Sequence, residues 1–189
     1  MISAIVLAAG FGRRFGSGKT LANHDGKALV RHVVDSVSVA EVDDVVVVAP
    51  GQATGFADAL AGSRARVVGN DRADAGMSRS LQVGLDAVDS ATEAVIIALA
   101  DQPLIARSTV EALLRDWRDS KAPIVAPLYR SERGHPVLFS AAVFPELRLL
   151  TGDRGAREVI ERDPSRVRLV PIDADVPKDV DTQEDLAAL

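Results

Sequence analysis

The sequence predicts a three-layer α/β fold in which helices cover both faces of a mostly parallel sheet. Two observations support this class. Short runs rich in Val and Ile recur along the chain, and segments with a helical spacing of apolar residues separate them. No internal repeat, low-complexity tract or long linker interrupts the alternation. With 189 residues and 47% hydrophobic content, the chain fits one well-packed domain, which we expect to span residues 1–189.

Seven short apolar runs are predicted to form the strands of this sheet. In a sheet that is covered on both faces, a strand reads as a continuous apolar run because both of its sides are buried. The runs cover residues 3–8, 44–49, 65–68, 94–99, 123–127, 136–139 and 167–171. The segments between them are expected to form the covering helices.

Three apolar stripes with the spacing i, i+3, i+4, i+7 predict helices between the strands. They consist of Val30, Val33, Val34 and Val37, then Leu81, Gly84, Leu85 and Val88, then Val110, Leu113, Leu114 and Trp117. Trp117 is interpreted as a core residue, because a single aromatic on such a stripe is usually packed inside. Ser108 followed by Glu111 predicts a capping box at the start of the third helix. Thr182 and Asp185 resemble a weaker capping box.

Charge and composition exclude several classes of protein. The net charge of −5 argues against a general nucleic-acid-binding protein, which carries a basic surface. The chain has no cysteine, so disulfides and thiolate metal sites are excluded and Mg²⁺ is favoured over zinc. No apolar run approaches the roughly 18 residues of a membrane span, and the N-terminus enters a strand without a basic n-region or cleavage site. We therefore expect a cytoplasmic protein with neither nucleic-acid nor membrane partners.

A glycine-rich loop with three cations and no acid follows the first predicted strand. Glycines let backbone N–H groups approach an anion closely because no side chain intervenes, and the cations neutralise its charge. The glycines are Gly10, Gly12, Gly16 and Gly18, and the cations are Arg13, Arg14 and Lys19. This loop is predicted to bind the polyphosphate of a nucleotide.

Two better-known phosphate-binding motifs do not match this loop. Gly18-Lys19-Thr20 has the ending of a P-loop, but Arg13 occupies the position that needs glycine. The dinucleotide fingerprint fails because its third glycine, Gly16, comes one residue too late. The sequence therefore supports neither a P-loop ATPase nor an ordinary dehydrogenase, and the alternative to a nucleotide site is a solvated loop with incidental arginines.

Polar residues also follow other predicted strands, at the edge where parallel α/β sheets bind ligands. Asp101 follows a buried strand and lies two residues before Pro103. A carboxylate at a strand end beside a phosphate-binding loop is well placed to hold Mg²⁺. Its alternative role is that of a turn residue or helix N-cap. Ser78 and Ser80 lie at a predicted helix start, where free N–H groups favour a phosphate, ribose or base. Ser78 has the alternative role of capping that helix.

A histidine and two arginines mark a further region of interest. His135 lies at the mouth of an apolar strand, while Arg154 and Arg157 lie near the first turn of a predicted helix. Arginine there opposes the helix dipole, which indicates that an anion binds nearby. The alternative is ordinary surface charge on a helix that also carries glutamates. His24 and His32 are interpreted as structural or surface residues.

Six short motifs follow one another along nearly the whole chain. They are Leu7-Ala8-Ala9-Gly10 with Arg14-Phe15-Gly16 and Lys19, Gly76-Met77-Ser78 with Ser80, Asp101-Gln102-Pro103, Arg133-Gly134-His135-Pro136, Gly152-Asp153 with Gly155-Ala156-Arg157, and Asp179-Val180-Asp181-Thr182. In this order they resemble the molybdenum cofactor cytidylyltransferase group of the MobA-like NTP transferases. The resemblance implies a Rossmann-like fold of the nucleotide-diphospho-sugar transferase type, with CTP as substrate, Mg²⁺ as cofactor and molybdenum-bearing molybdopterin as acceptor.

The resemblance also implies a role for each matching residue. It assigns the base and ribose to Leu7, Ala8, Ala9 and Gly10, and the remaining nucleotide side of the cleft to Gly76, Met77 and Ser78. It assigns the triphosphate to Arg14 and Lys19, which with Asp101 are the expected catalytic residues. It assigns the metal to Asp101 and Asp181, and the second substrate to Ser80, Gln102, His135, Asp153, Arg154 and Arg157.

The implied reaction moves CMP from CTP to a phosphate-bearing acceptor and releases pyrophosphate, with a molybdenum hydroxylase as the candidate recipient of the product. Ala9 points to cytosine, because related guanylyltransferases carry glycine at that position. Phe15 stands where the family has Met, and residues 20–24 replace its Leu-Leu-Pro run. These departures spare the charged positions but leave the acceptor open. The alternatives are another phosphorylated acceptor, an oxidoreductase on the same scaffold, or an accessory protein for cofactor insertion.

Overall fold

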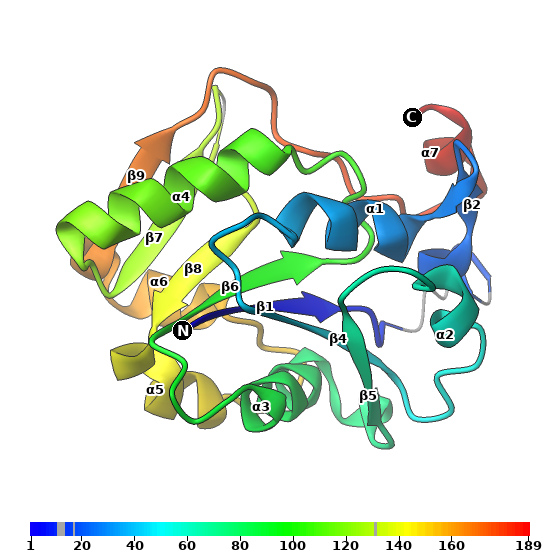
Figure 1. Cartoon of the computed structure of the whole chain (residues 1–189), viewed down its shortest axis with the longest axis horizontal. Coiled ribbons are helices and arrows are strands. Elements are labelled where there is room, and N and C mark those ends of the chain that lie inside the picture. Colours follow the sequence, from blue (N-terminus) through cyan, green and yellow to red (C-terminus); the bar gives the residue numbers. More distant parts are fainter. Residues whose placement is uncertain (11–13, 17, 131) are drawn as a thin grey trace.

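The computed structural model describes residues 1–10, 14–16, 18–130 and 132–189. Within these residues, seven strands form one sheet in the order β5-β4-β1-β6-β8-β7-β9 (Figure 1). The strands are β1 (Ile2–Leu7), β4 (Asp44–Pro50), β5 (Arg66–Asn70), β6 (Ala94–Leu99), β7 (Ile124–Leu128), β8 (Val137–Ser140) and β9 (Val167–Pro171). Each predicted strand is present, with its ends shifted by at most about two residues, as is usual for boundaries read from a sequence.

The sheet is mostly parallel, which confirms the predicted fold class. Strand β1 pairs in parallel with β4 and β6, β4 with β5, and β7 with β9. Strand β8 runs antiparallel to both of its neighbours, β6 and β7. The carboxyl ends of β1, β4, β5 and β6 therefore meet at one edge of the sheet, where open α/β sheets bind their ligands.

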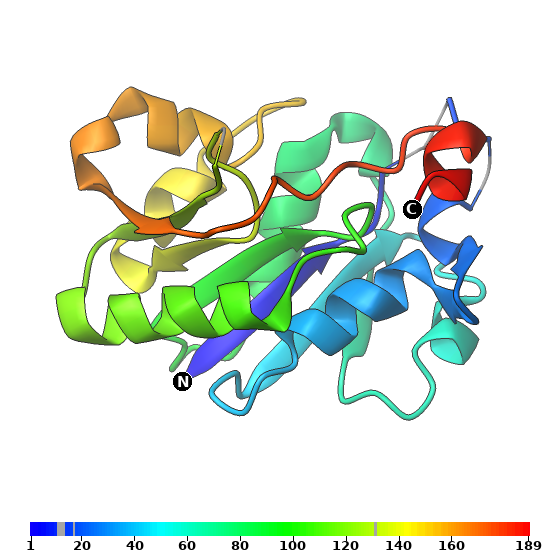
Figure 2. The same cartoon turned by 90° about the horizontal axis from the view of Figure 1, so that it is seen from above.

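One face of the sheet is covered by α1 (Leu29–Val37) and α4 (Arg107–Ser120), with the short helix α2 (Phe56–Ala59) beside them (Figure 2). The predicted stripes of α1 and α4 are buried in this layer. Trp117 is only 5% exposed, which confirms its interpretation as a core residue.

The opposite face is covered by α3 (Met77–Ala87), α5 (Phe144–Arg148) and α6 (Arg157–Arg162) (Figure 2). Helix α3 approaches the sheet closely at Gly84, where a Cβ atom would lie 2.6 Å from Cγ2 of Ile5. Real Cβ atoms do not pack at that distance, so the absence of a side chain allows the helix to lie directly on β1.

The two predicted capping boxes have opposite outcomes. The box of Ser108 and Glu111 is wrong, because α4 begins at Arg107, one residue before Ser108, and its N-cap is Ala106 without a side-chain bond. Glu111 instead pairs with Arg107 at 3.4 Å. The box of Thr182 and Asp185 is confirmed at the start of α7 (Gln183–Ala187), where each side chain bonds the other's backbone N–H.

Several short elements were not predicted. Strands β2 (Asn23–His24) and β3 (Lys27–Ala28) form a hairpin before α1, and both views place α7 beside it (Figures 1 and 2). His32 Nε2 lies 2.8 Å from the carbonyl of His24, consistent with a structural role. Single 3-10 turns occupy Lys19–Leu21, Ala73–Ala75, Ala141–Val143 and Pro164–Arg166. None of the described helices has the length and apolar character needed to cross a membrane.

Candidate active site

A cavity of about 220 Å³ opens at the carboxyl ends of β1 and β6. Its lining residues come from the glycine-rich loop, the start of α3, the end of β6 and the loop before α6. They are Leu7, Ala9, Gly10, Lys19, Thr20, Ala73, Gly76, Met77, Ser80, Leu99, Asp101 and Asp153. The cavity therefore lies where the topology predicts a ligand, and it brings together residues that are up to 146 positions apart, from Leu7 to Asp153.

Not every residue assigned to the nucleotide lines this cavity. Ala8 is 2% exposed and packs in the core on the α1 side, because successive side chains of an extended segment point to opposite faces. Its amide donates a hydrogen bond to the Val48 carbonyl at 2.8 Å. Gly12 and Arg13, which belong to the predicted phosphate loop, lie outside the described residues.

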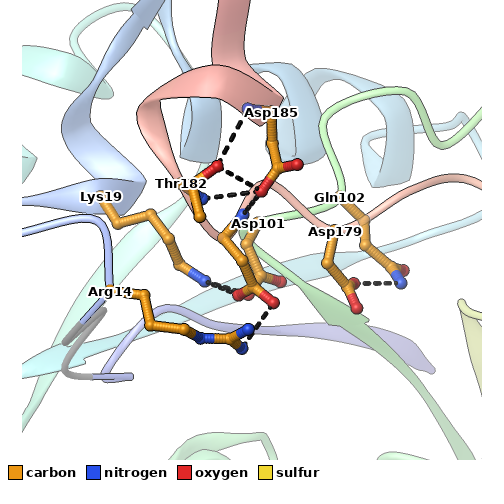
Figure 3. Close-up of polar contacts among 8 residues, drawn as sticks. Arg14, Lys19, Asp101, Gln102, Asp179, Thr182 and Asp185 are labelled. Atoms are coloured by element: carbon orange, nitrogen blue, oxygen red, sulfur yellow. Dashed lines mark hydrogen bonds and ion pairs between the residues drawn. The ribbon is translucent and has the colours of Figure 1, made fainter. Parts of the chain in front are cut away.

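Two cations and two carboxylates form an ion-pair cluster (Figure 3), and two of its members, Lys19 and Asp101, line the cavity. Lys19 Nζ lies 2.6 Å from Oδ2 of Asp101 and 3.2 Å from Oδ1 of Asp181. Arg14 Nη2 donates to Oδ2 of Asp181 at 2.7 Å. Residues from the first loop, from the end of β6 and from the segment before α7 thus meet at one point.

The environment keeps Lys19 charged. Its side chain is only 8% exposed, and this burial acts to lower its pKa. The hydrogen bonds and negative charges of Asp101 and Asp181 outweigh burial, so the net pKa of Lys19 is raised. The lysine is therefore an ammonium ion at neutral pH, and together with Arg14 it balances the charge of the two carboxylates.

The donor set at Asp101 and Asp181 fits a magnesium ion that takes its other ligands from elsewhere. Both carboxylates reach one cationic centre, and their side chains remain 24% and 34% exposed. Mg²⁺ is commonly held by one or two carboxylates and completes its shell with waters and substrate phosphates. Among the described residues, no group of three or more His, Cys, Asp or Glu side chains is placed to hold a metal. The site therefore suits a metal that binds together with a nucleotide.

The start of α3 is fixed against a loop from the distant part of the chain. Ser78 is 2% exposed, and its hydroxyl donates to the Gly152 carbonyl at 2.7 Å, so the structure places it outside the cavity. The N-cap of α3 is Gly76, so Ser78 does not cap the helix. Ser80 does line the cavity, and its hydroxyl oxygen accepts a hydrogen bond from Asn70 at 3.0 Å.

Asp153, which was expected to bind the second substrate, lines the first cavity because the loop before α6 packs against the start of α3. Gly76 lies against the backbone of Gly152 and Asp153, and a Cβ atom on Gly76 would be 2.7 Å from the Asp153 nitrogen. A Cβ atom on Gly155 would lie 2.7 Å from Sδ of Met77. The loop before α6 is therefore seated directly on the nucleotide side of the cleft.

A second cavity, of about 310 Å³, lies between β8 and α6. His135 and Arg157 line it together with Arg133, Val137, Phe139 and other residues. His135 Nδ1 is buried and has no hydrogen-bond partner among the described residues. Burial lowers the pKa of His135, despite opposing effects of the Ile97 carbonyl and of nearby carboxylates, so the ring is neutral at neutral pH.

Arg154 and Arg157, which were expected to bind an anion, each form an ion pair with a glutamate. Arg154 Nη1 lies 3.0 Å from Glu158, and Arg157 Nε lies 2.6 Å from Glu161, both one helical turn ahead. Arg157 lines the second cavity, whereas Arg154 lines neither of the two cavities. The observed pairing agrees with the alternative of surface charge for Arg154.

Two acidic residues near the cluster, Asp179 and Asp185, are not among the predicted site residues. Asp179 accepts a hydrogen bond from Gln102 Nε2 at 2.7 Å (Figure 3). Gln102 was assigned to the second substrate, but it is 6% exposed and its Oε1 is buried without a partner within the described chain. Asp185 accepts a hydrogen bond from the amide of Asp181 at 3.0 Å. The pairing of Asp185 with Thr182 was predicted from the sequence, but the contacts of Asp179 with Gln102 and of Asp185 with the Asp181 amide were not.

Solved structures of similar overall shape exist. The Rv0371c protein of Mycobacterium tuberculosis H37Rv superposes with a TM-score of 0.85 at 30% identity, over 99% of this chain and 95% of that chain. A structure of Rv0371c in complex with manganese gives a TM-score of 0.80 at 31% identity, over 99% and 96% of the two chains. A nucleotidyl transferase from Methanothermobacter gives 0.79 at 26% identity, over 100% and 95%.

Sequence comparison adds a curated relative and a family. The bifunctional protein GlmU of Listeria innocua is 34% identical over 125 residues, which cover 63% of this chain. The match spans only about a quarter of the length of that relative, 26%. The model of the MobA-like NTP transferase domain matches residues 4–167, so the chain belongs to the MobA-like NTP transferase family.

Proposed function

We propose that this protein transfers CMP from CTP to a phosphate-bearing acceptor, molybdopterin with bound molybdenum, and releases pyrophosphate. The observation that carries the proposal is the ion-pair cluster of Lys19 and Arg14 with Asp101 and Asp181 at the mouth of a cavity lined by Gly10. Cationic side chains beside backbone N–H groups that no side chain covers are suited to bind a triphosphate. A pair of carboxylates is suited to bind the metal ion that accompanies it.

Magnesium is the proposed cofactor, held by Asp101 and Asp181. The manganese complex of the similar Rv0371c protein supports a divalent cation in a protein of this fold. When bound with the nucleotide, such an ion would neutralise phosphate charge and polarise the phosphorus that is attacked. Lys19 now occupies the space between the two carboxylates, and we infer that its ammonium turns to the triphosphate in the loaded enzyme.

The chain's own residues have little proton chemistry to perform. A phosphate oxygen of the acceptor is already an anion, so it can attack the α-phosphorus without a general base. The difficulty lies in bringing two anions together and in stabilising the charge that develops as the bond to pyrophosphate breaks. Lys19 and Arg14 are the groups proposed to neutralise that charge.

The second cavity is the proposed place for the acceptor. Arg133 supplies positive charge, and Val137 and Phe139 supply an apolar wall for the body of the molecule. Arg157 also lines this cavity, but it pairs with Glu161 in the free protein. The neutral ring of His135 offers a hydrogen-bonding group on the same side. A molybdenum hydroxylase remains the proposed recipient of the product.

The choice of CTP is supported by Ala9, which lines the nucleotide cavity at the position where the related guanylyltransferases carry glycine. A methyl group there narrows the space for a base. Cytosine, with one ring, needs less of that space than guanine.

The test is a pyrophosphate-release assay with CTP, GTP, ATP and UTP, each combined with molybdopterin or with sugar phosphates. We expect the highest rate with CTP and molybdopterin. The variants D101A and K19A should lose 100-fold or more in kcat, on the order of the effect of removing one transition-state-stabilising group, while circular dichroism shows an intact fold. Undiminished pyrophosphate release in both variants would refute the proposed site, and turnover of NAD(P)H in its place would favour an oxidoreductase.

A further inference from the structure

The segment 179–189 lies outside the range matched by the family model, yet it completes the ion-pair cluster. It is fixed to the rest of the molecule at Val180, whose amide donates to the Asp101 carbonyl at 2.9 Å. The Val180 side chain is fully buried and packs with Phe15 and Leu29. Phe15 follows Arg14 directly, so the same segment contacts the glycine-rich loop through an apolar cluster and through an ion pair.

Asp185 holds the backbone of this segment through one carboxylate oxygen. Its Oδ2 accepts hydrogen bonds from the amide of Asp181 at 3.0 Å, from the amide of Thr182 at 2.7 Å and from the hydroxyl of Thr182 at 2.9 Å (Figure 3). The Thr182 hydroxyl also accepts from the Asp185 amide at 3.1 Å. Hydrogen bonds from Thr182 and from the amide of Asp181 lower the pKa of Asp185, so the carboxylate is charged at neutral pH.

The residue whose amide is held in this way is the one that supplies the second carboxylate. Asp181 contacts Lys19 at 3.2 Å and Arg14 at 2.7 Å, whereas Asp185 makes no ion pair with either cation. We propose that Asp185 is a positioning residue, which fixes the backbone of Asp181 so that its carboxylate faces Asp101 across the metal site. This inference rests on the proposed function, because it assumes that Asp181 binds a divalent cation.

A purely structural role for Asp185 as a helix cap makes a different prediction. Capping stabilises α7, a helix of five residues at the surface, and its loss would lower the melting temperature without any special effect on cation binding. Outer-shell groups that orient metal ligands have a second effect, since their removal typically weakens metal binding by about 10–100-fold. The two roles are separated by measuring cation affinity together with thermal stability.

The chain offers a matched control at Asp163. Its carboxylate caps another short helical turn, where Oδ1 accepts from the amide of Ser165 at 3.2 Å and from its hydroxyl at 2.6 Å. Asp163 lines neither the nucleotide cavity nor the second cavity. The variant D163A therefore removes a comparable cap with no expected effect on the metal site.

The experiment measures how much Mn²⁺ tightens CTP binding to the full chain, by calorimetric titration of CTP with and without Mn²⁺, for wild type, D185A, D185N and D163A. We expect the tightening by Mn²⁺ to fall by about 10–100-fold in D185A and to be unchanged in D163A, while both variants lower the melting temperature to a similar extent. D185N should also reduce the tightening, but less than D185A, because asparagine keeps one acceptor oxygen while it loses the charge and the second oxygen.

The outcomes separate this inference from the proposed function. If Mn²⁺ tightens CTP binding in wild type, and in D185A to within threefold of the wild-type effect, Asp185 is only a cap and the inference is overturned. If Mn²⁺ does not tighten CTP binding in wild type, the proposed metal site fails and the inference fails with it. Should D185A not fold, D185N decides, and a Mn²⁺ effect equal to that of wild type overturns the proposal.

Discussion

Replacing Gly76 by alanine should damage both stability and the nucleotide site. The residue has φ 98° and ψ 178°, a region that is essentially restricted to glycine, and a side chain there costs about 1–3 kcal/mol of strain. The added Cβ would also meet the backbone of Gly152 and lie 2.7 Å from the nitrogen of Asp153. These are backbone atoms that cannot rotate away, which adds about 1–3 kcal/mol of overpacking. The total loss in unfolding free energy is therefore about 2–6 kcal/mol.

The assay is urea unfolding of G76A beside G62A, with CTP affinity measured on both variants. Gly62 also has a positive φ, 74°, but nothing lies within 4 Å of its added Cβ, so G62A reports backbone strain of about 1–2 kcal/mol without a clash. We expect G76A to lose clearly more stability than G62A and to bind CTP more weakly, because Gly152 and Asp153 must move. A loss in G76A no larger than in G62A would refute the reasoning.

Three further predictions concern single side chains. The pKa of His135 is lowered in the folded state, so its contribution to stability is present above about pH 6.5 and is lost as the pH falls through the lowered pKa. Urea unfolding at a series of pH values should show this loss in wild type and not in H135Q. T182A should lower the unfolding free energy by about 1 kcal/mol and S108A by less than about 0.5 kcal/mol, because Thr182 forms its capping box and Ser108 does not. Equal losses in the two variants would contradict this reasoning. K19M should lower the unfolding free energy of the ligand-free protein by about 1–2 kcal/mol. This is less than the loss expected when a fully buried ion pair is broken, because the two carboxylates are partly solvated. Mg²⁺ should restore part of the loss in the same urea assay.

The succession of strands and helices along the chain was predictable from the pattern of apolar residues. A strand that is buried on both faces is a continuous apolar run, whereas a helix that is buried on one side has an apolar stripe. The direction of β8 was not predictable, since an apolar run reads the same in a parallel and an antiparallel strand. The hairpin of β2 and β3 is two residues long in each strand and leaves no periodic signal. The start of α4 was predicted one residue or more too late, because Ser108 was interpreted as the N-cap. Serine is common at N-caps, but a serine near a helix start does not fix the boundary.

The position of the site was predictable from topology, and the pairing of its residues was not. Lys19, Asp101 and Asp181 meet because β1 and β6 are neighbours and the last segment returns across their ends. Local sequence could not show that Ser78 bonds the distant Gly152, because that contact depends on how two loops pack. The placement of Asp153 in the first cavity follows from the same packing.

We propose that Asp101 and Asp181 hold a divalent cation together with a nucleotide that Lys19 also contacts. The most direct measurement is calorimetric titration of CTP into wild type, D101N and D181N, each with and without Mg²⁺. We expect Mg²⁺ to tighten CTP binding in wild type and to have little effect in either variant. Equal tightening by Mg²⁺ in all three proteins would contradict it.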